Sequence, residues 1–377
     1  MYRITLVSAL IIAALRGWGQ DGTQKIMPFT HFVVAGSTHL VLVDMDFDNS
    51  GIFDPGQGTV HFTGTGNDSL LGSSATTFYN LVLDKSVAPN FFWIPPELPI
   101  GPPPPCGFRN QLTFQGAGSK IMLLSRDLIV GPGASIVGAN PDNFIVTAGA
   151  GKVVKEGFTN FTYPVGNTAN RYTPLQLTQI GQDNIGVRCL PHVLEFGNSG
   201  APFTAGVVDV AWEVTRSQFG PSTLALTAYW NADDELPGFD GNDCGLSQAL
   251  PLGDWDLAGA NIGQKSGQGP FYMTRSGITL LNGASGVFAV GSEPLMYPLR
   301  VGMKTFLQGA FNPGTGLMND NLRTQQLIPL IEPYSEIPGF THVGRGGGET
   351  VSPNVLGISG SEAIVDWVFV ELRDGAN

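Results

Sequence analysis

The stretch GTVHFTGTG (58–66) recurs in outline as NQLTFQGAG (110–118). In each, an apolar residue and a phenylalanine lie two positions apart, and a Gly-small-Gly triplet follows. Residues two apart face the same side of a β-strand, and glycine supplies the positive φ that tight turns need. The repeat therefore predicts short strands separated by glycine corners and places the chain in the all-β class.

The same pattern of short apolar stretches and glycine turns continues downstream in LIVGPGASIVGAN (128–140) and FIVTAGAGKVVKE (144–156). A stack of short coils wound into a parallel β-helix would account for such a repeat. A β-sandwich would account for it as well, because periodicity does not report how strands pair. We expect a β-helix-like solenoid domain over residues 20–165.

A proline-rich insertion interrupts this domain at 89–106, PNFFWIPPELPIGPPPPC. Such a stretch favours polyproline II and is not expected to join a central sheet strand. One interpretation is an exposed recognition loop with Phe91, Phe92 and Trp93 as binding anchors. The other, which we prefer, is an insertion whose aromatic residues cover the side of the stack.

Longer strands are expected between residues 166 and 294. Val207–Thr215 and Thr223–Asn231 both carry apolar residues at alternate positions, which indicates strands with one buried face. Trp212 and Trp230 are the expected large core residues. We interpret this region as a β-sandwich domain.

The last part of the chain, 295–377, is expected to be a partial β-sandwich-like domain. Arg300–Gln308 and Ala363–Leu372 both read as strands. The second is strongly apolar, and a strand of this kind should be paired or covered. An exposed edge at Val365–Leu372 that pairs with another chain would favour oligomerisation into a filament or matrix.

The N-terminus is typical of an export signal. Arg3 precedes the uncharged run ITLVSALIIAAL (4–15), and Gly17-Trp18-Gly19 follows it. This order of charge, apolar run and small residues predicts a signal peptide over residues 1–19. No later run is long enough for a membrane span, so the mature chain is expected to be secreted or at the outer cell surface.

Three cysteines, Cys106, Cys189 and Cys244, are an odd number for an oxidising compartment. Their spacing matches no zinc pattern. A Cys189–Cys244 disulfide is one alternative, and three buried thiols are the other, which we prefer.

Composition limits the range of partners. The formal net charge is −12, and only 13% of the residues are charged, against roughly 25% in an average protein. An acidic chain of this kind argues against binding to nucleic acid or to anionic lipid. Only five histidines are present, and none shows the spacing of a zinc site.

The order of several strings resembles that of large secreted and surface-anchored β proteins of Bacteroidota that use the type IX secretion system. These strings are GTVHFTGTGNDSLLGSSATTFYNLVLDKS (58–86), GASIVGANPDNFIVTAGAGKVV (133–154), FTYPVGNTANRYTPLQLT (161–178), WNADDELPGFD (230–240), GVFAVGSEP (286–294), FLQGAFNPGTGLMNDNLRTQQLIPLIEPY (306–334) and GGGETVSPNVLGISGSEAIVDWVFVELRD (346–374).

The resemblance implies a multidomain architecture of β-helix-like repeats and sandwich modules, with no catalytic residues to carry over. Such proteins end in a sorting tail. This chain stops at Asn377 without one, so the resemblance implies a C-terminal truncation and leaves surface attachment in doubt.

Asp44, Asp46 and Asp48 form the best candidate metal site. Carboxylates at i, i+2 and i+4 resemble the start of a calcium loop, and they would share one face of a strand. An EF-hand would need Gly at position 49 and Glu at position 55, where the chain has Asn49 and Pro55. Calcium is the one cofactor that the sequence suggests, and a solvated strand edge is the alternative.

Two further features could carry function. Asn67-Asp68-Ser69 reads as a plain β-turn, with an O-glycan on Ser69 as the alternative. The acidic stretch 233–243 contains five carboxylates, and two of them at the right separation could serve glycoside hydrolysis. We interpret it instead as a solvated loop, and we expect no catalytic residues.

Three functions remain open. The first is a non-enzymatic extracellular structural or adhesive protein, with glycans or other surface proteins as partners. The second is a carbohydrate-binding module or a non-catalytic part of a polysaccharide-processing protein, for which Phe91, Phe92, Trp93 and Trp255 are the candidate aromatics. The third is a self-assembling filament or matrix subunit.

Overall fold

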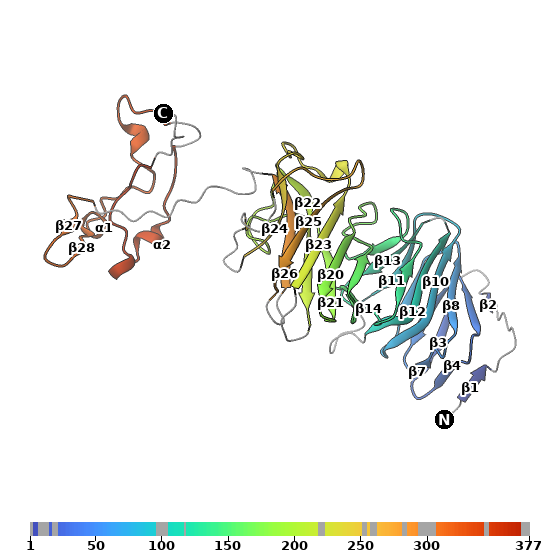
Figure 1. Ribbon diagram of the computed structural model, residues 1–377. Helices are drawn as coiled ribbons and strands as arrows, with labels where there is room; N and C mark the ends of the chain where they lie inside the picture. The colour runs from blue at the N-terminus through green and yellow to red at the C-terminus, as the bar shows by residue number, and fades with distance from the viewer. Residues whose placement is uncertain are drawn as a thin grey trace. The chain divides into compact units, whose positions relative to one another are not determined.

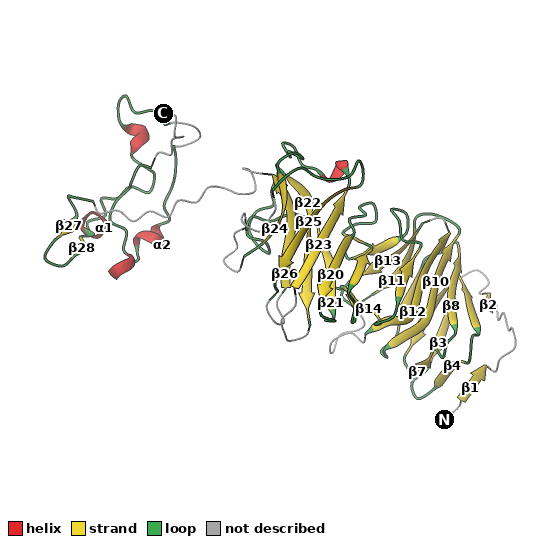
Figure 2. Cartoon of the chain, in the orientation of Figure 1, coloured by secondary structure: helices red, strands yellow, loops and turns green. Residues whose placement is uncertain are grey.

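The computed structural model shows an all-β chain (Figures 1 and 2). It describes residues 3–6, 15–16, 22–95, 105–116, 118–217, 223–250, 255–256, 262–280, 285–292, 307–342 and 347–370. The chain divides into two compact units, Met1–Leu299 and Arg300–Asn377.

The N-terminal region is a β-solenoid of about six turns. Parallel pairing confirms the β-helix alternative and excludes a sandwich for these coils. One wall of the solenoid is the parallel part of the largest sheet (Figure 1), made of β2 (Leu15–Arg16), β5 (His39–Val43), β8 (Thr59–Gly64), β10 (Thr76–Lys85), β12 (Cys106–Gly116), β14 (Leu128–Val130) and β17 (Val153–Lys155), with β15 (Ser135–Val137) also paired to β12.

A second wall is a seven-stranded sheet, and a third, shorter sheet completes the first coils. The second wall contains β3 (Gly22–Ile26), β6 (Met45–Asn49), β9 (Asp68–Leu71), β11 (Asn90–Ile94), β13 (Ser119–Leu123), β16 (Phe144–Val146) and β19 (Val165–Gly166). The third contains β1 (Arg3–Leu6), β4 (His31–Val34) and β7 (Ile52–Asp54).

Stacked apolar columns form the solenoid core. The strand register places Leu42, Phe62, Leu83 and Phe114 beside one another in successive coils, and all four are buried. Full burial of such a side chain stabilises the folded chain by about 1.5–3 kcal/mol. Each coil therefore depends on its neighbours for its core.

The strand β11 corrects the interpretation of the proline-rich insertion. Asn90–Ile94 lies inside the second wall, between β9 and β13, and Phe92 is only 2% exposed. The five residues NFFWI alternate inward and outward between Pro89 and Pro95, so they pair as a central strand despite the surrounding prolines. Residues 96–104 of the insertion lie outside the described residues.

Beyond the solenoid the pairing becomes antiparallel. In the largest sheet the last parallel strand is β17, which pairs with β21 (Ile185–Leu190). The same sheet continues through β22 (Val207–Arg216), β26 (Ser285–Ser292) and β24 (Cys244–Gln248). A separate four-stranded antiparallel sheet contains β18 (Asn160–Tyr163), β20 (Leu175–Ile180), β23 (Thr223–Trp230) and β25 (Phe271–Ile278), and the short helix η1 (Ala232–Asp234) follows β23.

Trp212 and Trp230, predicted as core residues, are both fully buried. The Trp212 indole donates a hydrogen bond to the Thr173 carbonyl at 2.9 Å. The sandwich assignment of 166–294 stays a prediction, and the strands on both sides of residue 166 share one sheet.

The C-terminal unit contains little regular structure in the part that is described. Its elements are β27 (Phe311–Asn312), β28 (Leu317–Met318), α1 (Asn321–Thr324), η2 (Tyr334–Glu336), α2 (Pro353–Leu356) and η3 (Gly360–Glu362). The predicted strand Ala363–Leu372 is wrong over 363–370, which form no strand. Local contacts replace a ladder here: the Trp367 indole donates to the Pro329 carbonyl, and the Tyr334 hydroxyl donates to the Trp367 carbonyl.

Other predicted segments of this unit fall partly outside the described residues. Residues 300–306 of the strand expected at Arg300–Gln308 lie there, as do residues 371 and 372 of the expected exposed edge. The described part of the expected edge, residues 365–370, therefore forms no strand that could pair with another chain.

All three cysteines are buried free thiols. Burial raises the pKa of Cys106, Cys189 and Cys244 to about 12, so these thiols stay protonated and unreactive. The Cys189–Cys244 disulfide does not form. No helix in the described ranges has the length and apolar character required to cross a membrane.

The segment predicted as an export signal contributes two short strands. Arg3–Leu6 pairs in parallel with β4, and Leu15–Arg16 pairs in parallel with β5. Cleavage after residue 19 would remove both pairings. Export stays a prediction that N-terminal processing can test.

Glycine corners give a prediction about stability. Gly116 has a φ of +79°, and a Cβ there would lie 2.2 Å from the Lys85 carbonyl oxygen, whereas a Cβ at Gly133 would meet nothing within 4 Å. We expect Gly116→Ala to lower the free energy of unfolding by about 1–3 kcal/mol and Gly133→Ala to leave it within about 1 kcal/mol. Urea denaturation measures both, and equal effects would contradict this account of the corners.

Candidate functional site

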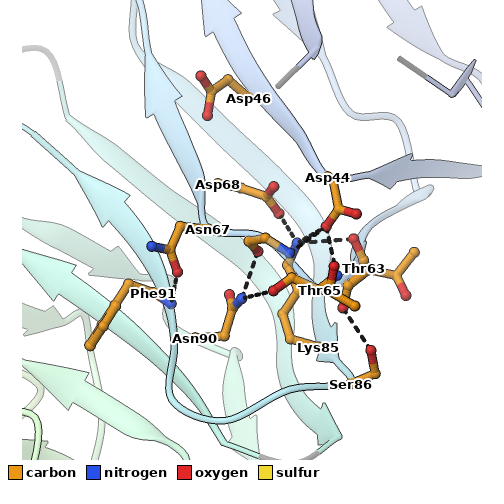
Figure 3. A network of polar contacts seen from close by, with 12 residues as sticks. Asp44, Asp46, Thr63, Thr65, Asn67, Asp68, Lys85, Ser86, Asn90 and Phe91 are labelled. Carbon is orange, nitrogen blue, oxygen red and sulfur yellow. Dashed lines mark hydrogen bonds and ion pairs between the residues drawn. The ribbon is translucent and has the colours of Figure 1, made fainter. Parts of the chain in front are cut away.

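A buried ion pair occupies one corner of the solenoid (Figure 3). The register aligns Asp68 with Phe92, and Phe92 with Ile121 in the next coil; the carboxylate thus enters a column that is otherwise apolar. The Lys85 ammonium lies 2.5 Å from Asp68 Oδ2 and donates a hydrogen bond to the Thr63 carbonyl at 2.9 Å.

Burial is the main influence on the Asp68 carboxyl. It raises the pKa of Asp68 to about 7, with smaller raising effects from the carboxylates of Asp44 and Asp46. The hydrogen bond and the charge of Lys85 act in the opposite direction. A carboxyl that titrates near neutrality inside a core is a candidate for function, but this one contacts a structural lysine and lines no described cavity.

Asp44 closes the same corner from the preceding coil. It adopts a positive φ of 49°, and its Oδ1 accepts hydrogen bonds from the backbone amides of Thr65 and Gly66, both at 2.7 Å. A Cβ at Gly64 would lie 2.2 Å from this carboxylate. Glycine at position 64 therefore leaves the space that the Asp44 side chain occupies.

The three aspartates predicted to bind calcium make separate contacts with different partners. Asp44 holds the corner, Asp46 accepts the Ser69 amide at 2.7 Å, and Asp48 pairs with Lys25 at 2.8 Å. Among the described residues, no cluster of three His, Cys, Asp or Glu side chains could hold a metal. The structure thus provides no shared ligand set at these positions.

Asp46 belongs to a recurring arrangement at the start of strands. A side-chain oxygen of Asp or Asn accepts the backbone amide that it faces in an adjacent coil. The pairs are Asp46 with Ser69, Asn67 with Phe91, Asp127 with Lys152 and Asn143 with Ser119, at 2.7–2.9 Å. These acidic and amide side chains replace ladder bonds where a coil turns.

Buried lysines satisfy the opposite groups, the corner carbonyls. Lys120 donates to the Asp142 carbonyl at 2.6 Å, and Lys155 donates to the carbonyls of Gly131 and Pro132 at 2.5 and 2.7 Å. Burial lowers the pKa of both lysines, and the nearby carboxylates of Asp142 and Glu156 oppose that shift. Lys85 makes the same kind of contact.

The predicted aromatic anchors lie on both faces of one strand. Phe92 points into the core, while Phe91 and Trp93 lie half-buried on the outer face with ring centroids 5.6 Å apart. They pack with Met122, Phe144 and Val146. The arrangement agrees with aromatics that cover the side of the stack and brings at most two of the three anchors near solvent.

Ser69 lies within β9, paired with Trp93, so the predicted turn at 67–69 is wrong: Asp68 and Ser69 begin a strand. The alternation of Asp68 with Leu70 on the inward face was the signal for this strand. The O-glycan on Ser69 stays a prediction.

The acidic stretch 233–243 is also engaged in structural contacts. Asp234 pairs with Arg171 at 2.9 Å, and Glu235 accepts the Trp230 indole at 2.8 Å and the Lys265 ammonium at 2.6 Å. Trp255, a candidate exposed aromatic, is 8% exposed and donates to the Leu194 carbonyl.

An open polar groove lies between the solenoid corner at residues 132–136 and the strands β18 and β20 of the four-stranded sheet. Its volume is about 610 Å³, and its lining combines residues 132–136, Lys155, residues 157–162, Gln176 and Gln182. The groove was not predicted from the sequence. Asn160 and Gln176 meet because β18 and β20 pair antiparallel, and local composition carries no signal for that pairing.

No protein-family model, curated protein or solved structure matches this chain.

The buried carboxyl predicts a pH dependence of stability. The pKa of Asp68 in the folded chain, about 7, exceeds its ordinary value of 3.8, so folding binds a proton between these values. This contribution to stability is complete below about pH 4 and is lost as pH rises through 7, with a slope of at most about 1.4 kcal/mol per pH unit. Asp68→Asn should remove that slope from urea denaturation curves.

The matched control is Asp48→Asn, which removes a carboxylate paired at the surface with Lys25. It should keep the slope of the wild-type chain between pH 4.5 and 7.5. Parallel curves for Asp68→Asn and the wild type would show that Asp68 does not titrate in this range.

The two faces of β11 give another prediction. Phe92→Ala should lower the free energy of unfolding by about 3–5 kcal/mol, the usual effect of a cavity in a core. Phe91→Ala, on the half-buried outer face, should cost clearly less. Chemical denaturation compares the two, and a larger loss for Phe91→Ala would refute the inward position of Phe92.

Proposed function

We propose that this protein is a non-enzymatic structural or adhesive scaffold that acts outside the cytoplasmic membrane. The observation that carries the proposal is the use of its ionisable groups at the corners. The buried Lys85, Lys120 and Lys155 hold corner carbonyls, and the half-buried Asp44 and the exposed Asp127 hold backbone amides. These ionisable side chains are thus engaged in hydrogen bonds that hold the coils of the solenoid together.

The stacked coils support a mechanical role. About six turns with a spacing of ~4.8 Å between strands give a stiff element roughly 25 Å long. Continuous ladders and filled corners leave few backbone groups open to proteases.

We propose further that the antiparallel region forms a β-sandwich. The sheet that contains β21, β22, β26 and β24 and the sheet that contains β18, β20, β23 and β25 contribute to a single apolar core, with Trp212 and Trp230 among its members. This supports two layers that share one interior. Such a module would extend the scaffold.

A carbohydrate-binding role is the second candidate, favoured by the polar groove beside β18. The third candidate, a filament subunit, has no strand at 365–370 that would support it.

Purified chain on beads tests the adhesive role. Beads that carry the folded protein should be retained under flow on surfaces coated with polysaccharide or with bacterial cells, and beads with urea-unfolded protein should not. A panel of glycosides, esters and peptides should yield no product. Turnover of any of them by the pure chain, lost in an Asp→Asn variant, would replace the scaffold proposal with an enzyme.

Processing tests export. Expressed in a Bacteroidota host, the chain should be recovered outside the cytoplasm, shortened by the predicted signal of residues 1–19. Leu10→Arg, which interrupts the apolar run, should stay unprocessed in the cytoplasm, and Val137→Arg, at a residue 46% exposed, should behave as the wild type. Mass spectrometry of each fraction measures this. A full-length wild-type chain in the cytoplasm would contradict export.

A further inference from the structure

The polar groove has the composition of a site for an uncharged ligand rich in hydroxyl groups. Six of its side chains are uncharged and polar, and no carboxylate is among its lining residues. These six are Ser135, Thr159, Asn160, Thr162, Gln176 and Gln182. Hydroxyl and amide groups both donate and accept hydrogen bonds.

The one charged side chain that lines the groove, Lys155, already donates its hydrogen bonds to groups within the protein. The Lys155 ammonium donates to the carbonyls of Gly131 and Pro132 and to that of Glu156 at 3.2 Å. An ammonium has three protons to donate, so all three have acceptors within the protein. The groove therefore presents no free cation for a phosphate, a sulfate or a carboxylate.

The walls of the groove are held in place before any ligand binds. Lys155 ties the corner at 131–132 to β17, and the Asn184 side chain accepts the Gly157 amide at 3.1 Å where the chain has a φ of +43°. Gln176 donates to Asn160 at 3.2 Å. Sites of this kind lose little entropy on binding.

An aromatic ring is fixed among these polar groups. Phe161 is half-buried, its ring packs against Phe158 and Tyr163 at 6.1 and 4.9 Å, and the Lys155 ammonium lies 5.6 Å from its centroid. A rigid ring offers an apolar surface for the C–H face of a sugar, while the neighbouring amides reach its hydroxyl groups.

We infer that this groove binds a neutral oligosaccharide. The inference rests on the adhesive role proposed above and names the ligand of that role. Asn160 and Gln176 supply the hydrogen bonds, and Phe161 supplies the apolar contact. The volume of about 610 Å³ is in the usual range of ligand sites and suits a few sugar rings.

The test starts with an array of neutral oligosaccharides of different linkages, together with acidic oligosaccharides and peptides as separate arms. The neutral probe with the highest signal is then titrated by calorimetry into the full chain. Asn160→Ala and Gln176→Ala should each weaken binding about tenfold or more, which corresponds to about 1.4 kcal/mol.

Asn110→Ala is the matched control, because Asn110 donates to Asn80 at 2.7 Å in an amide pair on β12 and β10 that does not line the groove. It should bind the probe as the wild type does. Circular dichroism of each variant separates loss of binding from loss of folding, and Gln182→Ala, at an exposed position, gives a second variant at low folding risk.

The outcomes distinguish the inference from the adhesive proposal. Beads that adhere equally with Asn160→Ala and Gln176→Ala would overturn the groove and leave the scaffold role intact. Binding to the peptide or acidic arm alone, or to no arm, would overturn a neutral sugar as the ligand. Absence of both bead retention and array binding would overturn both.

Discussion

Each coil of a parallel β-solenoid must turn corners, and each corner removes backbone groups from the ladder that joins the coils. Unpaired amides and carbonyls in a dry interior are costly. Here Asp and Asn side chains accept the amides, as at the buried Asn143, and buried lysines donate to the carbonyls, as at Lys155. The remaining architecture depends on this pairing, because the apolar columns align only if the corners close at the same level in every coil.

The corner at Lys85 shows how closely these groups are connected. The register places Lys85 between Gly64 and Gly116 in neighbouring coils. Both glycines have positive φ, and at Gly64 the missing side chain leaves room for the Asp44 carboxylate. The ammonium charge in turn makes a carboxylate tolerable at Asp68. The cost is a buried ion pair, which contributes little net stability but fixes which residues can meet at this corner.

Part of this could be predicted from the sequence, and the reason is physical. The repeat that aligns Phe62 with Phe114 matches the observed register, in which both belong to one core column, because inward positions recur once per coil. Local sequence patterns gave wrong predictions of strands where strand formation depends on the segment that lies alongside. NFFWI at 90–94 alternates correctly, but the surrounding prolines dominate the composition. Residues 363–370 alternate equally well, yet their indole and carbonyl groups are satisfied by Pro329 and Tyr334, so no ladder forms.

The groove could not be predicted because it belongs to the place where two modes of pairing meet. A parallel stack has an open edge after its last coil, and such an edge invites uncontrolled pairing. In this chain β18 and β20 follow β17 in a separate sheet, and β21 then returns to pair antiparallel with β17, which closes the edge. The corner at 131–136 is then left facing the segment 157–162 across a polar gap. A site at this junction does not lower the stability of the stack, because Lys155 both lines the groove and closes the coil through the Gly131 carbonyl.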